Sequence, residues 1–310
     1  MSHLTLHVGL KTDSVQYRYS YEWLFRLLAE EGIGHAQLGS FFEMYQLPDE
    51  YFIALRQQAE RYGVRISSVF TTHRELGGWF RQEPGWEAVS FRAFRRMIEV
   101  GALLGADAVG GSAGAVLRDQ MESKASGIRR FAAAMKQLMG YAYKRGVSAL
   151  LIEPMSCLAE PPTLPEEIVA MGEELNAHHA AHPTSTSPVG YCVDIAHGYL
   201  DESGALGYDN LALFRATLPY LRVVHLKNTD ARFDSTFGFT EAERARGIVQ
   251  VEKFRDLLLD ARRAAILPVG EVVGHLEIGG PKLGRDYSDH KLEGMLRESL
   301  RHLRETFRST

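Results

Sequence analysis

The sequence lacks most of the features that mark membrane-bound, secreted or nucleic-acid-binding chains. No run of 18 apolar residues occurs among its 310 residues, so we expect no membrane-spanning helix and no membrane partner. The N-terminal segment has no positively charged stretch followed by an apolar core, so we expect no signal peptide. The net charge of −4 argues against a nucleic-acid partner.

Cysteine is scarce, and one common cofactor motif is absent. Only Cys157 and Cys192 occur, and a reduced, cytoplasmic location is the simpler expectation, with a disulfide between them as the open alternative. No GxGxxG motif follows the first predicted strand. Its absence removes the main sequence sign of a dinucleotide-binding fold.

Eight strand-then-helix units can be traced along the chain. The predicted strands cover residues 5–10, 34–39, 64–70, 106–110, 148–153, 190–195, 222–227 and 273–278. Amphipathic helices are predicted at 21–32, 49–63, 86–105, 120–145, after Pro165, and at 209–217, 251–264 and 291–307. This alternation implies a parallel sheet, and eight units favour an α/β fold closed into a single (β/α)8 TIM barrel. With no linker or repeat in the sequence, we expect one domain over 1–310.

Four metal-ligand residue types each end a short apolar run just ahead of a loop. They are Glu153, Asp194, His225 and Glu277. Because the carboxyl ends of parallel strands meet at one end of a barrel, we expect the four side chains to converge there. Three carboxylates in one place repel one another unless a cation lies between them. The sequence therefore predicts one divalent ion. The oxygen-rich ligand set suits Mn²⁺ or Mg²⁺, with Co²⁺ and Zn²⁺ open.

The ligand on the last strand has an alternative. Glu271 lies six residues before Glu277 and could bind the ion instead. We prefer Glu277 because the run GHLEIGG is followed by a loop and the final helix, whereas Glu271 precedes the centre of the strand.

The pattern resembles the xylose-isomerase-like barrel superfamily of sugar isomerases and epimerases. These barrels have a Glu on strand five, Asp-x-x-His after strand six, a His on strand seven and a Glu on strand eight. The matching positions here are Glu153, Asp194 with His197, His225 and Glu277. Within the superfamily, the stretches VGLKTD, GSFFEMY, VFTTHRELGGW and LEIGGPKLGRDYSDH look closest to erythrulose-phosphate (tetrulose-phosphate) 3-epimerases.

The resemblance implies roles for individual residues. Glu153 and Glu277 would be catalytic, each binding the metal and moving a proton, and His197 would contact substrate oxygens. The family also has an Arg soon after the strand-seven His. Arg232 lies near that place, at a spacing that differs from the family pattern.

A phosphate site is predicted after strands seven and eight, where barrels often bind phosphate. Candidate groups there are Lys227, Arg232, the glycines at 279 and 280, Lys282 and Arg285. Adjacent glycines free backbone N–H groups for an anion, and basic side chains add charge. The alternative is that Lys282 and Arg285 are solvated loop charges. His73 ends strand three and is either a substrate contact or a structural hydrogen-bonding residue.

These features together predict a metal-dependent isomerase or epimerase of a short phosphorylated ketose such as erythrulose phosphate. Removing a proton beside a carbonyl creates an enediolate, which a metal stabilises, and epimerisation needs a second acid on the opposite face. A free-ketose 3-epimerase and a sugar dehydratase stay open as alternatives. An apurinic-site endonuclease fits less well because VGGSAGAV after strand four offers no imidazole for a three-zinc cluster. A non-catalytic sugar-phosphate binding protein would not need two carboxylates beside a metal. The sequence leaves the oligomeric state open, a homo-oligomer included.

Overall fold

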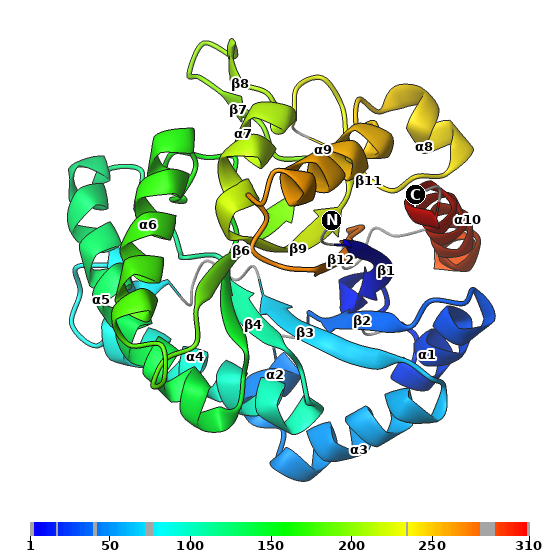
Figure 1. The fold of residues 1–310 in the computed structure, drawn as a ribbon, viewed down its shortest axis with the longest axis horizontal. Helices are drawn as coiled ribbons and strands as arrows, with labels where there is room; N and C mark the ends of the chain where they lie inside the picture. The colour runs from blue at the N-terminus through cyan, green and yellow to red at the C-terminus, as the bar shows by residue number, and fades with distance from the viewer. Residues whose placement is uncertain are drawn as a thin grey trace.

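Eight parallel strands close into a barrel (Figure 1). This computed structural model describes residues 3–16, 18–39, 42–71, 77–233, 235–279 and 289–308. Around the barrel the strands follow the order β1-β12-β9-β6-β5-β4-β3-β2, so the first strand pairs with the last. Their bounds are β1 Thr5–Lys11, β2 His35–Leu38, β3 Arg65–Thr71, β4 Ala108–Gly111, β5 Ala149–Ile152, β6 Val189–Asp194, β9 Leu221–Leu226 and β12 Glu271–Leu276. The predicted TIM barrel is confirmed.

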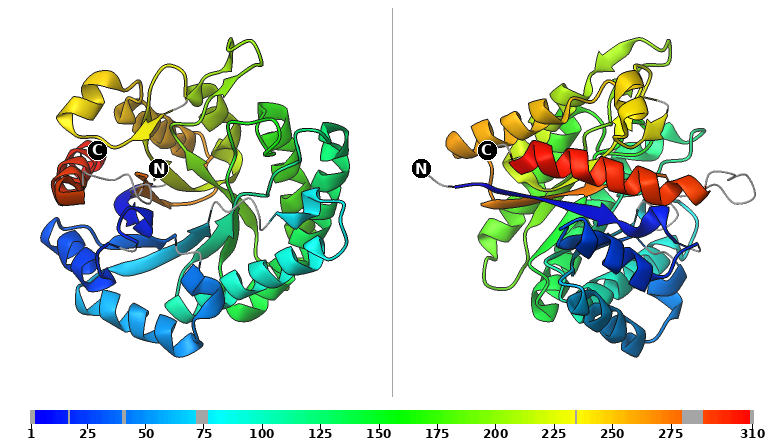
Figure 2. Two further views of the ribbon diagram at one scale, coloured as in Figure 1. Left: turned by 180° about the vertical axis from the view of Figure 1, so that it is seen from behind. Right: turned by 90° about the vertical axis from the view of Figure 1, so that its right-hand side faces the viewer.

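Helices surround the barrel on its outside (Figure 1). They are α1 Tyr21–Glu30, α2 Phe42–Gln46, α3 Asp49–Arg61, α4 Trp86–Leu104, α5 Lys124–Arg145, α6 Pro165–Ala181, α7 Asn210–Thr217, α8 Glu241–Arg246, α9 Val251–Arg263 and α10 Asp289–Arg308. The last helix, α10, lies alongside β1, which brings the two ends of the chain together (Figure 2). Among the described residues, no helix is long and apolar enough to cross a membrane.

The predicted strands and long helices have counterparts within a few residues, whereas the shortest elements were not predicted. These are α2, α8 and two small hairpins, β7 Tyr199–Leu200 with β8 Leu206–Tyr208 and β10 Asn228–Thr229 with β11 Thr236–Phe237. Strands of two or three residues are too short to show the alternation on which a strand prediction depends. The last barrel strand also begins and ends two residues earlier than predicted, so Glu277 lies just past it.

Local signals in the sequence explain where the helices begin and end. The hydroxyl of Ser20 accepts a hydrogen bond from the Trp23 N–H and caps the start of α1. Gly105 and Gly146 follow α4 and α5 with φ of 68° and 77°, the left-handed backbone that glycine adopts without strain. Cys157 and Cys192 are both free thiols, so the structure does not form the alternative disulfide.

The interior of the barrel is apolar on one side and polar on the other. An apolar cluster fills the lumen beside β3 to β9, formed by Phe70, Ala108, Ala149, Leu151, Cys192 and Val223. Alternate residues of β1 point the opposite way from its core-facing leucines, and these are His7, Gly9 and Lys11. A Cβ on Gly9 would lie 2.7 Å from the ring of the buried His275, so glycine leaves room for that imidazole. Polar groups therefore line the barrel from one end to the other along β1.

Candidate metal centre

The structure brings the four predicted ligands together at the C-terminal end of the barrel. Glu153 follows β5, Asp194 ends β6, His225 lies in β9, and Glu277 follows β12. One ligand atom from each lies within 4.8 Å of the others, and all four side chains are buried. The backbone register sets this convergence, because Asp194 pairs directly with His225 and the Glu277 N–H donates to the Leu226 carbonyl.

The structure also separates the two candidates on the last strand. Glu271 is the first residue of β12 and lies at the N-terminal end of the barrel, with its side chain 57% exposed. Glu277 follows the same strand at the C-terminal end and is the glutamate that joins Glu153, Asp194 and His225.

The imidazole of His225 is held in an orientation suited to metal binding. Its Nδ1 atom lies 3.0 Å from both Glu153 Oε1 and Glu277 Oε2. On the other side of the ring, Nε2 lies 2.7 Å from Gln37 Oε1, and the Gln37 amide nitrogen donates to Ser68 Oγ at 2.9 Å. This amide orientation requires Nε2 to carry a proton, so Nδ1 is the ring nitrogen that faces the carboxylates and would bind an ion in place of its own proton.

Sequence reasoning missed Gln37. Its only signal was a polar residue inside the otherwise apolar end of the short β2 strand, HAQL. The side chain is fully buried, and a buried amide has to find hydrogen-bond partners. Its link to His225 joins residues 188 positions apart, which only the closed barrel shows.

The carboxylates fit a divalent ion because several of their oxygens lack hydrogen-bond donors. Among the described residues, Glu153 Oε2, Asp194 Oδ2 and Glu277 Oε2 are buried and accept no hydrogen bond of acceptable geometry. Two of them still contact a cation, since Lys227 Nζ lies 2.7 Å from Asp194 Oδ2 and 3.0 Å from Glu277 Oε2. These two contacts of Lys227 are ion pairs rather than oriented hydrogen bonds. Carboxylate oxygens buried in this way are the ligands that a hard cation takes.

A second lysine, which sequence reasoning also missed, lies beside the centre. Lys11 ends β1, is 1% exposed, and places Nζ 2.6 Å from Glu277 Oε1 and 2.9 Å from Asp13 Oδ2. Burial opposes its charge, but the carboxylates of Asp13 and Glu277 outweigh that effect and raise the pKa of Lys11. The predicted first strand ended at residue 10, whereas β1 includes Lys11 as its last residue.

These lysines keep the carboxylates ionised. Burial alone would raise the pKa of Glu277, but Lys11, Lys227 and His225 outweigh burial and hold that pKa well below its usual range. Asp194 behaves in the same way, because Lys227 and His197 outweigh burial and lower its pKa. The centre therefore presents charged carboxylates that can bind a cation or accept a proton.

The other predicted site residues fall in different places. His197 lies beside the centre, with Nδ1 donating to the Pro154 carbonyl at 2.8 Å and Nε2 3.4 Å from Asp194 Oδ2. Lys227 lies in the centre itself, against two of the carboxylates.

The remaining predicted site residues lie away from the centre or outside the described residues. Arg232 is exposed, and its backbone N–H donates to Asp230 Oδ1. His73, Lys282 and Arg285 lie outside the described residues. The predicted substrate contacts of all these residues stay predictions.

Comparison with solved structures finds the same fold in several proteins. A protein from Rhodospirillum rubrum, provisionally named a xylose isomerase, is 18% identical with a TM-score of 0.78, over 97% of this chain and 99% of that chain. D-Psicose 3-epimerase from Clostridium cellulolyticum is 15% identical with a TM-score of 0.71, over 97% and 99%. A protein from Bacillus anthracis, provisionally assigned as a 3-DHS dehydratase, is 12% identical with a TM-score of 0.64, over 96% and 98%.

At these identities the structural likeness shows the shared fold alone. No curated protein sequence matches the chain. A family model, described as a xylose isomerase-like TIM barrel, matches residues 25–306. The match covers nearly the whole chain, and the protein therefore belongs to the xylose isomerase-like TIM-barrel family.

Proposed function

We propose that the protein is a metal-dependent isomerase or epimerase that moves a proton on the carbon beside the carbonyl of a short phosphorylated ketose. One observation carries the proposal. Glu153 and Glu277 approach His225 Nδ1 to 3.0 Å from β5 and β12, which have two other strands between them in the barrel order. Two carboxylates on different sides of one centre match a reaction that removes and returns a proton.

The residues that would hold the ion are Glu153, Asp194, His225 and Glu277. A divalent ion bound there supplies positive charge to the carbonyl and hydroxyl oxygens of a substrate as negative charge develops. Gln37 would keep the His225 ring in place through the hydrogen bond to Nε2. His197, fixed by the Pro154 carbonyl, would orient a substrate hydroxyl.

The two glutamates differ in their surroundings, and the difference suggests separate roles. Glu277 contacts Lys11 and Lys227, which hold the pKa of Glu277 low and make it a weak base. Glu153 makes no ion pair with a lysine among the described residues, and its Oε2 atom accepts no hydrogen bond. We therefore assign removal of the substrate proton to Glu153, whose free oxygen faces the centre without a paired ammonium group. Glu277 would pass a proton from the Lys227 ammonium, 3.0 Å away, to the opposite face of the substrate, and the proton taken by Glu153 would leave to solvent as solvent restores the ammonium.

Two alternatives use the same carboxylates. A dehydratase begins with the same proton abstraction, and a protein provisionally assigned as a dehydratase shares this fold. A free-ketose 3-epimerase needs no phosphate site, and D-psicose 3-epimerase shares the fold as well. The preference for a phosphorylated substrate is supported by the sequence resemblance and by the basic residues Lys282 and Arg285 after the last strand.

Deuterium exchange with solvent distinguishes these functions. Purified protein with Mn²⁺ is incubated in D₂O with erythrulose phosphate and, separately, with free erythrulose. An epimerase incorporates deuterium at C3 with inversion of configuration. A C1/C2 isomerase produces an aldose, and a dehydratase releases water. The absence of both exchange and product with every ketose tested would contradict the proposal and favour a binding protein.

The phosphate preference is tested with Lys282→Ala and Arg285→Ala. A phosphate dianion makes charge-assisted hydrogen bonds that a hydroxyl cannot match. Loss of one cation should cost about 1.5–3 kcal/mol in kcat/KM for the phosphorylated ketose and little for the free sugar. Equal losses on both substrates would mean that these residues only shape the loop. A wild-type enzyme that favours the free sugar would contradict the phosphate assignment.

A further inference from the structure

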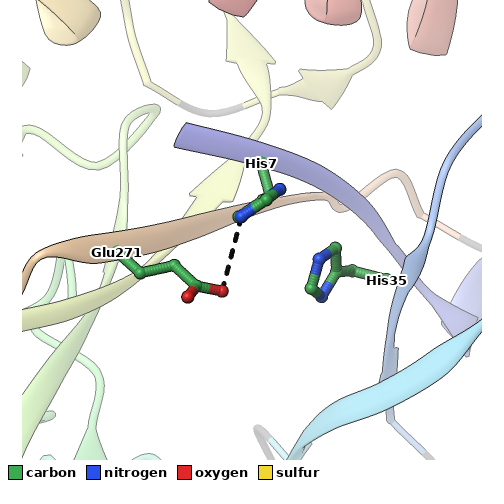
Figure 3. Close-up of side chains that lie close together, drawn as sticks. All are labelled: His7, His35 and Glu271. Carbon is green, nitrogen blue, oxygen red and sulfur yellow. Dashed lines mark ion pairs between the residues drawn. The ribbon is translucent and has the colours of Figure 1, made fainter. Parts of the chain in front are cut away.

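A second group of metal-ligand side chains lies at the opposite, N-terminal end of the barrel. His7, His35 and Glu271 come from β1, β2 and β12, three neighbouring strands (Figure 3). Glu271 pairs with Thr5, and His35 pairs with Gly9. His7 lies midway between these two partners on β1, so all three side chains share the inner face of the sheet.

The three side chains converge on a common space. One ligand atom from each lies within 4.8 Å of the others. His7 Nε2 is 3.4 Å from Glu271 Oε1, too long for a strong hydrogen bond, and the two imidazole rings are 4.7 Å apart at an angle of 43° (Figure 3). The rings are therefore tilted against each other beside the carboxylate rather than stacked face to face.

We propose that His7, His35 and Glu271 form a second metal site, for Zn²⁺ or a similar transition metal. Two imidazoles and one carboxylate are a ligand set that Zn²⁺ takes in proteins, with water in the fourth position. The set has fewer oxygen ligands than the three carboxylates and one imidazole at the other end, so the two sites should differ in metal preference.

The state of His35 supports metal binding. Its Nδ1 atom is buried and has no hydrogen-bond partner among the described residues. A buried ring nitrogen that neither donates nor accepts a hydrogen bond is available to a ligand.

The site can be reached from solvent. The side chains of His7 and Glu271 are 34% and 57% exposed. A cavity of about 410 Å³ adjoins Glu271 and is also lined by Arg65, Asp107 and His275. The cation of Arg65 is offset by Asp107 at 2.6 Å, which limits its repulsion of a metal ion. The cavity offers room for the water that completes the coordination.

A metal here would join the first, second and last strands where the barrel closes. β1 pairs with β12 on one side and with β2 on the other, so the ion would span the junction between the two ends of the chain. Because an ion that binds only the folded state stabilises it by mass action, Zn²⁺ should raise the melting temperature through this site.

The test is zinc binding to the full chain after removal of metals with a chelator, measured by equilibrium dialysis and by thermal melting. The wild type should bind two Zn²⁺ ions. The single variants His35→Gln and His7→Gln should each bind one of the two ions at least about tenfold more weakly. In each variant, the rise in melting temperature that Zn²⁺ produces should be smaller by the part that this ion contributes. Asp194→Asn, which impairs the other site, should keep the ion held by His7, His35 and Glu271.

His182→Gln provides the matched control. It removes one histidine of the pair formed by His178 in α6 and His182, the residue just after that helix. Their rings lie 4.6 Å apart, and neither residue belongs to a group of three potential metal ligands among the described residues. This variant should bind zinc like the wild type. Zinc binding and melting shifts in His35→Gln and His7→Gln that equal those of the wild type would overturn the proposal, as would loss of the second ion in His182→Gln alone. Circular dichroism of each metal-free variant establishes that it is folded.

Discussion

Lys11 Nζ lies 2.6 Å from Glu277 Oε1, so the first strand of the barrel supplies a counter-charge to the carboxylate that follows the last. The contact joins residues 266 positions apart. Lys11 Nζ also lies 2.9 Å from Asp13 Oδ2. Removal of the lysine would therefore take the positive charge away from both Asp13 and Glu277. The electrostatics of the candidate metal centre therefore depend on closure of the barrel.

Lys11→Met should move the acid limb of the activity profile to higher pH. In the wild type, burial raises the pKa of Glu277, but the charges of Lys11, Lys227 and His225 outweigh burial and lower that pKa. Without Lys11 that pKa rises, so Glu277 becomes protonated, and activity is lost, at a higher pH as the pH falls. Stability at neutral pH should fall by about 3–5 kcal/mol, as when one partner of a buried ion pair is removed.

The matched control for Lys11→Met is Lys136→Met. Lys136 pairs with Glu174 at 2.7 Å, but both side chains are partly exposed and lie on outer helices. Its loss should change stability by less than about 1 kcal/mol and leave the pH profile unchanged. An acid limb that stays in place in Lys11→Met would mean that Lys11 has only a structural role.

Gln37→Leu should weaken binding of the metal ion at the C-terminal centre. The variant removes the acceptor for His225 Nε2 while keeping a side chain of similar size. Loss of a partner that orients a metal-binding imidazole typically costs about 10–100-fold in affinity. Isothermal titration with Mn²⁺ measures the effect, and Gln137→Leu on the exposed face of α5 is the control. Wild-type affinity in Gln37→Leu would show that the ring is held by other contacts.

Glu153→Gln and Glu277→Gln should each reduce turnover by more than about a thousandfold. Each change combines loss of a metal ligand with loss of a proton carrier. Metal occupancy measured in each variant separates the two effects. A variant that keeps near-native turnover would remove that glutamate from the mechanism.

Glu31→Gln should lower stability at neutral pH but not in acid. Glu31 is 4% exposed and accepts hydrogen bonds from Arg297 at 2.9 Å and from Arg301 at 2.7 Å, which ties α1 to α10. Burial opposes the charge, but the bonds from Arg301 and Arg297 outweigh it and lower the pKa of Glu31 from 4.5. A carboxylate whose pKa is lower in the folded than in the unfolded protein stabilises the fold at any pH above its unfolded-state pKa. This contribution is lost as the pH falls through its folded-state pKa.

The size of this effect is checked by urea unfolding from pH 7 to pH 3. Glu31→Gln should cost about 1–2 kcal/mol at pH 7, with the difference from wild type shrinking below about pH 4.5. Glu30→Gln is the control because Glu30 is half exposed and contacts Arg297 alone among the described residues. It should cost less than about 1 kcal/mol. A difference between wild type and Glu31→Gln that persists unchanged at pH 3 would contradict the ionic explanation.

The sequence predicted the barrel and the convergence of four candidate metal ligands because both follow from local patterns. Glu153, Asp194, His225 and Glu277 each end a recognisable apolar run, and parallel strands bring such ends together. Lys11 and Gln37 were not predicted because neither residue shows its partner in the sequence until the barrel closes. The phosphate hypothesis depends on residues such as Lys282, which lie outside the described part of the chain.

The cluster at the N-terminal end was not predicted for a similar reason. His7 and Glu271 lie 264 positions apart in the sequence, and nothing in their local sequence distinguishes them from ordinary polar residues at the start of a strand. Glu271 was weighed only as an alternative ligand for the other centre. Its contact with His7 depends on the pairing of β1 with β12, which is a property of the closed barrel.

Anomalous diffraction from crystals soaked with Mn²⁺ tests the central claim most directly. We expect a peak bounded by Glu153, Asp194, His225 Nδ1 and Glu277, with Lys227 Nζ moved away from Asp194 to admit the ion. An empty centre at saturating Mn²⁺, with Lys227 still bridging Asp194 and Glu277, would contradict the metal centre and the proposed function that depends on it.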